Sequence, residues 1–383
     1  MHVLPFNRVA SQFGSQILVK LKSDWVTGSK SHPPGSLLAI DLDQFLRQGK
    51  DNTTVTVLFS PTDRMSMNGY SRTRNYLVIE ILEYVKSRLQ IWEFSESKGW
   101  IIKFVESEAA VRGISVSAID STTSDECWVT TSSFTTPSTL SMLNLQNINN
   151  AECTNVETLC ISTKSLPAKF DATGIVEFQE EAISADGTKV PYFVIMSGSL
   201  KRNGDNPTLL YGYGGFQVSI LPNYAAVLGC SWLAHGNILV HANIRGGGEL
   251  GPKWHQAALK ENRIKAYEDF IAVAEDLVRK KFTSPKRLGI RGGSNGGLLM
   301  GNMQIMRPDL FGAIVNAVPL LDMKRYSKLL AGASWMAEYG NPDTDDWLYL
   351  QQYSPYHNVQ LNVKYPPLLV TTSTKDDRVH PVN

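Results

Sequence analysis

Residues 292–296 read Gly-Gly-Ser-Asn-Gly and match the pattern G-x-S-x-G, in which a serine stands on a sharp turn between a strand and a helix. Glycines flank such a serine because larger side chains would collide with the two elements that the turn joins. Leu288–Ile290 predicts the strand, and residues 300–306 continue the predicted helix. The helix N-terminus and the amide of Asn295 would stabilise negative charge developing on a bound carbonyl group. The pattern predicts Ser294 as a nucleophile; a glycine-rich turn with an incidental serine is the alternative.

An acidic motif follows a later apolar strand. Residues 367–371 predict this strand, and Lys375-Asp-Asp-Arg378 comes shortly after it. In an α/β-hydrolase the acid of the catalytic triad lies on a loop after a later strand, and the histidine follows the acid in the chain. Asp376 and Asp377 are both candidates for this acid, with a charged surface loop as the alternative interpretation.

The histidine that should complete such a triad is missing from its expected place. His380 stands only four residues beyond Asp376, too close for the strand and loop that usually separate acid from base, so we interpret it as a loop histidine. The histidines that precede the acid do not fit the expected order: His235, His241, His255 and His357. We therefore expect the chain to stop before its catalytic histidine.

The first part of the chain predicts an all-β module. From about residue 15 to residue 165, short apolar or alternating runs rich in β-branched and aromatic residues are separated by turn residues. This pattern fits either a sandwich or the four-stranded blades of a β-propeller. At about 40–45 residues per blade, the region would hold roughly three to four blades.

The second part of the chain predicts a mostly parallel sheet. Apolar strands alternate with helical patterns, of which residues 266–281 form the longest, as expected for βαβ units. A chain of 383 residues is long enough for two cores. We place the boundary near residues 165–180, which gives an all-β domain over 1–170 and an α/β domain over 171–383.

From about residue 170 onward the chain resembles the prolyl oligopeptidase family, with motifs in the family's order and spacing. These motifs are Tyr211–Phe216, Ala242–Glu249, Gly292–Gly297, Arg307–Phe311, Trp335 with Glu338–Gly340, Tyr353–Pro355 and Asp376–Arg378. Upstream, Asp63-Arg64, Ser71–Leu77 and Phe134–Leu140 resemble the later blades of the family's propeller. The resemblance implies an α/β-hydrolase domain preceded by a partial β-propeller, in a fragment that lacks the first blades and the segment of the catalytic histidine.

The resemblance also implies catalytic roles for four residues. Ser294 would be the nucleophile of a serine peptidase, and Asp376, the first acid of its pair, would orient the histidine. The hydroxyl of Tyr213 would join the amide of Asn295 in an oxyanion hole, because a phenol can donate to developing charge as an amide does.

Substrate-binding roles follow from the same resemblance. Trp335 would stack on a proline ring, aided by Phe216 and Tyr339, and Arg378 would hold a carbonyl group of the substrate backbone. A family relative that cleaves after basic residues needs carboxylates in this pocket, whereas residues 318–335 offer only Asp322 among apolar residues. The expected substrates are therefore short peptides cleaved after proline, since the family's propeller admits only small chains.

The amino-acid composition limits the classes of partner, cofactor and cellular location that we expect for this protein. The 37 Lys and Arg residues nearly balance the 36 Asp and Glu residues, and no long basic run indicates nucleic acid. The four cysteines have neither metal-ligand spacing nor the density of a disulfide framework, so we expect no metal, no cofactor and a reducing cytoplasm. No stretch reaches the roughly 18–20 apolar residues that span a bilayer. We expect a monomer at full length; a periplasmic or secreted location stays open if the native N-terminus lies upstream.

Two other functions remain open from the sequence. One is a catalytically inactive, peptidase-like protein that binds other proteins or peptides, although the presence of Ser294, Asp376, Tyr213 and Trp335 argues against it. The other is an esterase of the same fold. An ester substrate needs no anchor for a peptide backbone, so Trp335 and Arg378 favour the peptidase.

Overall fold

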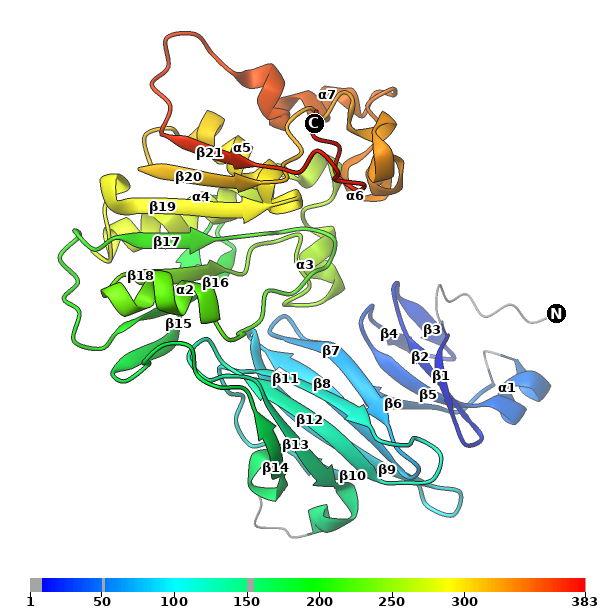
Figure 1. Cartoon of the computed structure of the whole chain (residues 1–383). Helices are drawn as coiled ribbons and strands as arrows, with labels where there is room; N and C mark the ends of the chain where they lie inside the picture. Colours follow the sequence, from blue (N-terminus) through cyan, green and yellow to red (C-terminus); the bar gives the residue numbers. More distant parts are fainter. Residues whose placement is uncertain (1–8, 50–51, 150–154, 383) are drawn as a thin grey trace. The chain divides into compact units, whose positions relative to one another are not determined.

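The computed structural model describes residues 9–49, 52–149 and 155–382 (Figure 1). They divide into two compact units: the first runs to Pro167 and includes the short segments 221–224 and 249–253, and the second contains the rest. Each unit has buried hydrophobic clusters of its own, as domains do.

The described part of the first unit contains three antiparallel sheets of four strands each. Their strands, in spatial order, are β1 (Val9–Phe13), β2 (Gln16–Lys20), β5 (Leu37–Asp41) and β6 (Val55–Phe59); β10 (Gly99–Val105), β9 (Lys86–Ser95), β8 (Tyr76–Glu83) and β7 (Met65–Arg72); and β11 (Gly113–Ala118), β12 (Glu126–Ser132), β13 (Thr139–Asn144) and β14 (Ile161–Ser165). The connections of the first sheet carry a hairpin of β3 (Trp25–Thr27) and β4 (Lys30–His32) and helix α1 (Leu42–Gln48). Four-stranded antiparallel sheets in series are the blades of a propeller, which favours the propeller over the sandwich.

Strand β8 explains why the middle sheet is so apolar. Side chains alternate between the two faces of a strand. Leu77, Ile79 and Ile81 belong to the hydrophobic cluster shared with the first sheet, and Tyr76 and Val78 to the cluster shared with the third. Since all five are at most 4% exposed, both faces of this strand are core.

The second unit is built on a seven-stranded sheet whose central and later strands are parallel. Its spatial order is β15 (Ile175–Ile183), β16 (Lys189–Ser197), β18 (Ile238–Ala242), β17 (Thr208–Tyr211), β19 (Leu288–Gly293), β20 (Ala313–Ala317) and β21 (Leu368–Thr371). Only β16 pairs antiparallel with its neighbours β15 and β18.

Helices cover both faces of this sheet. The helices α4 (Ile264–Arg279) and α5 (Asn295–Met306) share one hydrophobic cluster with it, and α4 contributes Phe270, Ala274 and Leu277 at helical spacing. Helix α2 (Ala226–Ser231) lies on the opposite face (Figure 1). A mostly parallel sheet between helices is the architecture of the predicted α/β-hydrolase domain. Shorter helices are α3 (Pro252–Gln256), α6 (Met336–Tyr339) and α7 (Trp347–Leu350).

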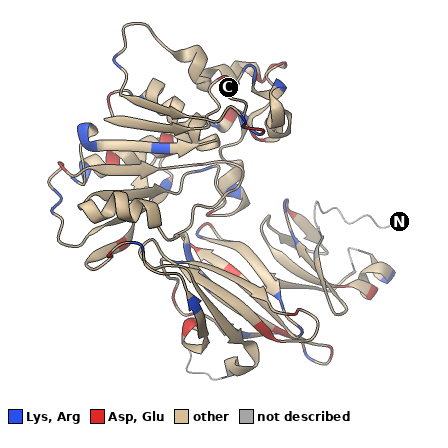
Figure 2. Cartoon of the chain, in the orientation of Figure 1, with Lys and Arg blue, Asp and Glu red and all other residues tan. Residues whose placement is uncertain are grey.

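Charges of both signs are interspersed along the described chain (Figure 2). Such a distribution gives no large field of one sign that would steer a polyanion. Among the described residues, no helix combines the length and the apolar composition needed to cross a bilayer.

Candidate active site

Ser294 stands on a strained turn between strand β19 and helix α5. Its backbone has φ 57° and ψ −119°, a left-handed conformation that residues other than glycine seldom adopt. A Cβ atom on Gly292 would lie 2.4 Å from the carbonyl oxygen of Gly296, so the close approach of strand and helix requires glycine there. The turn has the geometry that the G-x-S-x-G pattern predicts, and it leaves the Ser294 side chain partly exposed.

The two predicted catalytic segments emerge at one edge of the sheet. Strand β20 lies between β19 and β21, and all three are parallel. The N–H of Ser294 donates to the carbonyl of Ala317 at 2.9 Å, and the N–H of Val318 donates to that of Thr371 at 2.7 Å. These bonds tie together the carboxyl ends of the three strands, after which Ser294 and the loop of Asp376 follow.

The loop after β21 holds the carboxylate of Asp376 by its own backbone. Oδ1 of Asp376 accepts the N–H groups of Arg378 at 2.9 Å and of Val379 at 2.8 Å. These two donors lower the pKa of Asp376 below its ordinary value, because they favour the charged form. Val379 is buried in the core of the unit and anchors the loop. The side chain of Asp377 is exposed.

Tyr213 lies beside Ser294. Burial raises the pKa of the Tyr213 hydroxyl, while the nearby Ser294 side chain and the charges of Arg263 and Arg378 act in the opposite direction. The net shift of this pKa is upward, so the phenol keeps its proton and can donate a hydrogen bond to a developing oxyanion. The structure thus brings Tyr213, Ser294 and Arg378 into one neighbourhood.

Asn295 is joined to the Tyr213 loop through its side chain. As the first residue of α5, it has a backbone N–H without an acceptor inside the helix. Its side chain is 1% exposed, and Nδ2 donates to the carbonyl of Tyr213 at 2.6 Å. The N–H of Asn295 and the hydroxyl of Tyr213 are therefore carried by segments that are directly bonded to each other.

The three aromatic residues that were predicted to form the proline pocket differ in how they are buried and what they contact. Phe216 is partly buried, and its ring meets that of Tyr339 edge to face with centroids 5.6 Å apart. Tyr339 is fully buried, and its hydroxyl donates to Oδ1 of Asn295 at 2.8 Å. Trp335, 6% exposed, lies in the same hydrophobic cluster but makes no ring contact with these two aromatics among the described residues.

Two residues at this site, Arg263 and His255, carried no recognisable signal in the sequence. Arg263 is 1% exposed, and its Nη1 lies 2.9 Å from Oε1 of Glu338. His255 contacts the other oxygen of Glu338 at 2.7 Å. Arg263 and His255 are far from Glu338 in the sequence, so only the fold reveals the cluster; Glu338 itself stood inside a matched motif.

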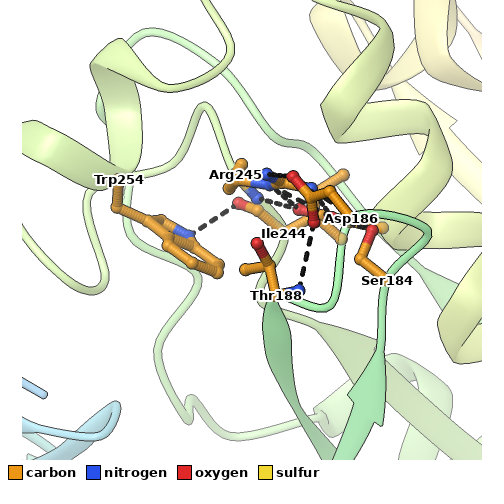
Figure 3. A network of polar contacts seen from close by, with 7 residues as sticks. Ser184, Asp186, Thr188, Ile244, Arg245 and Trp254 are labelled. Atoms are coloured by element: carbon orange, nitrogen blue, oxygen red, sulfur yellow. Dashed lines mark hydrogen bonds and ion pairs between the residues drawn. The ribbon is translucent and has the colours of Figure 1, made fainter. Parts of the chain in front are cut away.

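A second buried arginine supports the loop after β18 (Figure 3). Nε of Arg245 donates to Oδ2 of Asp269 at 2.9 Å, and Nη1 lies 2.5 Å from Oδ2 of Asp186. Nε1 of Trp254 donates to the carbonyl of Ile244 at 3.0 Å. The loop fixed in this way meets the Phe216 segment, where the N–H of the following residue, Gln217, donates to the carbonyl of Gly246 at 3.1 Å.

Three of the described histidines are bonded to groups other than Ser294 and Asp376. His255 pairs with Glu338, Nδ1 of His357 lies 2.8 Å from Oγ of Ser354, and Nδ1 of His380 accepts the N–H of Val382. Within residues 9–49, 52–149 and 155–382, no hydrogen bond joins a histidine ring to Ser294 or Asp376.

Comparison with known proteins identifies relatives of both units. The sequence pattern of the "Prolyl oligopeptidase family" matches residues 226–383, and that of the "Prolyl oligopeptidase, N-terminal beta-propeller domain" matches residues 6–154. An uncharacterized peptidase of Sinorhizobium fredii, y4nA, is 46% identical over 99% of this chain and 51% of its own length. A prolyl endopeptidase of Elizabethkingia miricola is 43% identical over 56% of this chain and 31% of its own.

A solved structure agrees with these sequence matches. The post-proline cleaving enzyme from Rickettsia typhi superposes with a TM-score of 0.86 and 36% identity, over 98% of this chain and 52% of that one. The chain thus spans about half the length of the relatives that it matches from end to end. The predicted fold class, an α/β-hydrolase domain preceded by β-propeller blades, is confirmed. The chain belongs to the prolyl oligopeptidase family.

Proposed function

We propose that this protein is a serine oligopeptidase that hydrolyses short peptides after proline. The observation that carries the proposal is the position of Ser294, on a left-handed turn at a helix N-terminus and near the hydroxyl of Tyr213. The names of similar proteins, a prolyl endopeptidase and a post-proline cleaving enzyme, support the substrate class.

The proposed reaction is acyl transfer through Ser294. A histidine takes the proton of Oγ as this oxygen attacks the carbonyl carbon, and Asp376 orients that histidine. The hydroxyl of Tyr213 and the N–H of Asn295 stabilise the oxyanion. The leaving amine takes the proton, and water then hydrolyses the acyl-enzyme by the same steps in reverse order. The mechanism requires a histidine at Asp376; among the described residues, the side chain of Asp376 is bonded to backbone N–H groups and to no histidine ring.

The proposed proline pocket combines aromatic walls with one charged anchor. Trp335 and Phe216 would contact the proline ring, with Tyr339 beneath them, since aromatic faces supply a large and rigid apolar surface. Arg378 is exposed and close enough to Tyr213 to affect its pKa, so its guanidinium could bind a carbonyl group of a peptide at Ser294.

The test uses what we call the completed protein: this chain joined to the residues of the Sinorhizobium fredii relative that lie outside the matched region. We expect it to cleave a fluorogenic peptide with proline before the scissile bond, and Ser294→Ala to abolish the cleavage. A matched peptide with alanine at that position should be cleaved more slowly. Cleavage that persists in Ser294→Ala would contradict the proposal. Equal rates of cleavage for the proline and alanine peptides would contradict it as well.

A further inference from the structure

Arg263 stands between the two segments that carry the proposed oxyanion donors. Its side chain is 1% exposed; Nη1 donates to Oε1 of Glu338 at 2.9 Å, and Nη2 donates to Oδ1 of Asn295. The guanidinium carbon also lies 5.1 Å from the centre of the Tyr339 ring. A planar guanidinium can hold two acceptors in fixed directions, which a lysine ammonium cannot do.

Both residues that accept hydrogen bonds from Arg263 are also hydrogen-bonded to the loop of Tyr213. Nδ2 of Asn295 donates to the carbonyl of Tyr213 at 2.6 Å, and Oε1 of Glu338 accepts the N–H of Phe216 at 2.9 Å. The packing between these two bonds is tight: a Cβ atom on Gly215 would lie 2.5 Å from Nδ2 of Asn295 and 2.9 Å from Nη2 of Arg263. Partners of Arg263 therefore hold this loop at two points.

The loop needs such support because its backbone is strained. Phe216 has φ 55° and Gln217 has φ 57°, so two consecutive residues with side chains adopt the left-handed conformation. Conformations of this kind persist only where the surroundings hold them. Without the partners of Arg263, the loop would relax and carry the Tyr213 hydroxyl away from Ser294.

We propose that Arg263 is a positioning residue that aligns the two oxyanion donors, through Asn295 on one side and Glu338 on the other. It touches no reacting atom. The inference rests on the proposed function for its catalytic consequence, but the alignment itself can be tested without activity.

The first experiment measures amide hydrogen exchange in the 383-residue chain. We expect residues 214–217 to exchange at least about tenfold faster in Arg263→Met than in the unchanged chain, because local opening sets the exchange rate of a held loop. The control is Asp276→Asn. Asp276 is 4% exposed, accepts a hydrogen bond from Tyr192, and lies on helix α4, which begins directly after Arg263; the two residues are about 20 Å apart along the helix axis. This control should leave residues 214–217 unchanged.

Unchanged exchange at 214–217 in Arg263→Met, or an equal increase in both variants, would overturn the proposal. If Arg263→Met does not fold, Tyr339→Phe replaces it, because this change removes only the hydroxyl that donates to Asn295. We expect about threefold faster exchange of 214–217 in that variant, as for the loss of one hydrogen bond. No change there would equally count against the proposal.

The second experiment is a double-mutant cycle in the completed protein. Tyr213→Phe should lower kcat about 100-fold, as loss of an oxyanion donor does, and Arg263→Lys about tenfold with little change in KM. If Arg263 acts through Tyr213, its substitution should matter little once the Tyr213 hydroxyl is gone. The double mutant should then have a kcat less than about threefold below that of Tyr213→Phe alone. Additive losses would show that Arg263 acts elsewhere. If the unsubstituted completed protein cleaves nothing, the proposed function fails, while the exchange experiment still decides on the alignment.

Discussion

The segments of Ser294 and Asp376 differ in how the second unit holds them. The turn of Ser294 is surrounded by buried partners, since Asn295 and Arg263 are each 1% exposed and are bonded to each other. The loop of Asp376 follows strand β21, all four residues of which are exposed, and its carboxylate is held by N–H groups of the same loop.

The two halves of the proposed site are therefore held in place by different kinds of contact. The proposed nucleophile and its oxyanion donors are aligned by contacts between residues far apart in the sequence, so they form when the domain packs. The proposed acid is oriented by bonds to residues two and three positions away, so its loop forms locally. Catalysis would need both halves, and the predictions below test each half in turn.

The comparison would break most plainly if the two halves catalysed hydrolysis without a histidine at Asp376. We expect kcat of the 383-residue chain alone to lie about 10⁶-fold below that of the completed protein, because a triad without its base loses about this much. The measurement is hydrolysis of the proline fluorogenic peptide by both proteins. Robust turnover by the chain alone, removed by Ser294→Ala, would contradict this prediction.

The two neighbouring acids give a matched pair for the other half. In the completed protein, Asp376→Asn should lower kcat about 10⁴-fold, because an amide cannot hold the histidine in the required tautomer. Asp377→Asn changes the same formal charge one residue away and should alter kcat by less than about threefold, as expected for an exposed side chain. The reverse order of effects would assign the triad to Asp377.

Trp335 tests the pocket that lies against the Ser294 half. Trp335→Ala removes a large aromatic surface, which costs about 2–4 kcal/mol and corresponds to a roughly 30- to 1000-fold loss in kcat/KM for proline peptides. The loss should be smaller for the matched alanine peptide, so the ratio of the two should collapse. Equal losses on both peptides, with a lowered Tm, would instead assign Trp335 to the core in which it is buried.

The smallest expected effect concerns the exposed strand beside the acid loop. Leu368, Leu369 and Val370 of β21 are 39%, 57% and 44% exposed on the edge of the sheet, so we expect the 383-residue chain to self-associate. Leu369→Lys should weaken this association, because a charge blunts an edge strand. The control is Val227→Lys, at a position 78% exposed on helix α2. Sedimentation gives the oligomeric state, and a monomeric chain with a cooperative melt above about 50 °C would contradict the prediction.

The local features of both halves were the easier ones to predict from the sequence. The glycines around Ser294 mark a turn that few sequences can form, and the structure has that turn. The sequence left Asp376 and Asp377 as equal candidates by position, because the choice depends on which carboxylate the loop amides reach. Only the resemblance favoured Asp376, and the structure gives that carboxylate two amide donors.

The contacts between residues far apart in the chain could largely not be predicted from the sequence. Arg263 lies 32 residues from Asn295 and 75 from Glu338, and a single arginine before a helix carries no pattern that indicates such partners. Tyr339 was expected to line the pocket, yet it is fully buried with its hydroxyl on Asn295. An aromatic residue near a pocket has the same sequence appearance whether it faces the ligand or supports the residue that does.

Strand β8 has a consequence for how the first unit can change in length. Because its alternate side chains fill two different cores, inserting one residue would exchange the two sets and disturb both neighbouring sheets together. Connections are far more tolerant, since the entropy of closing a loop grows slowly with its length. The connection between β2 and β5 already contains the hairpin of β3 and β4. Insertions and deletions among homologous chains should therefore collect in such connections, while the strands of the middle sheet keep their length.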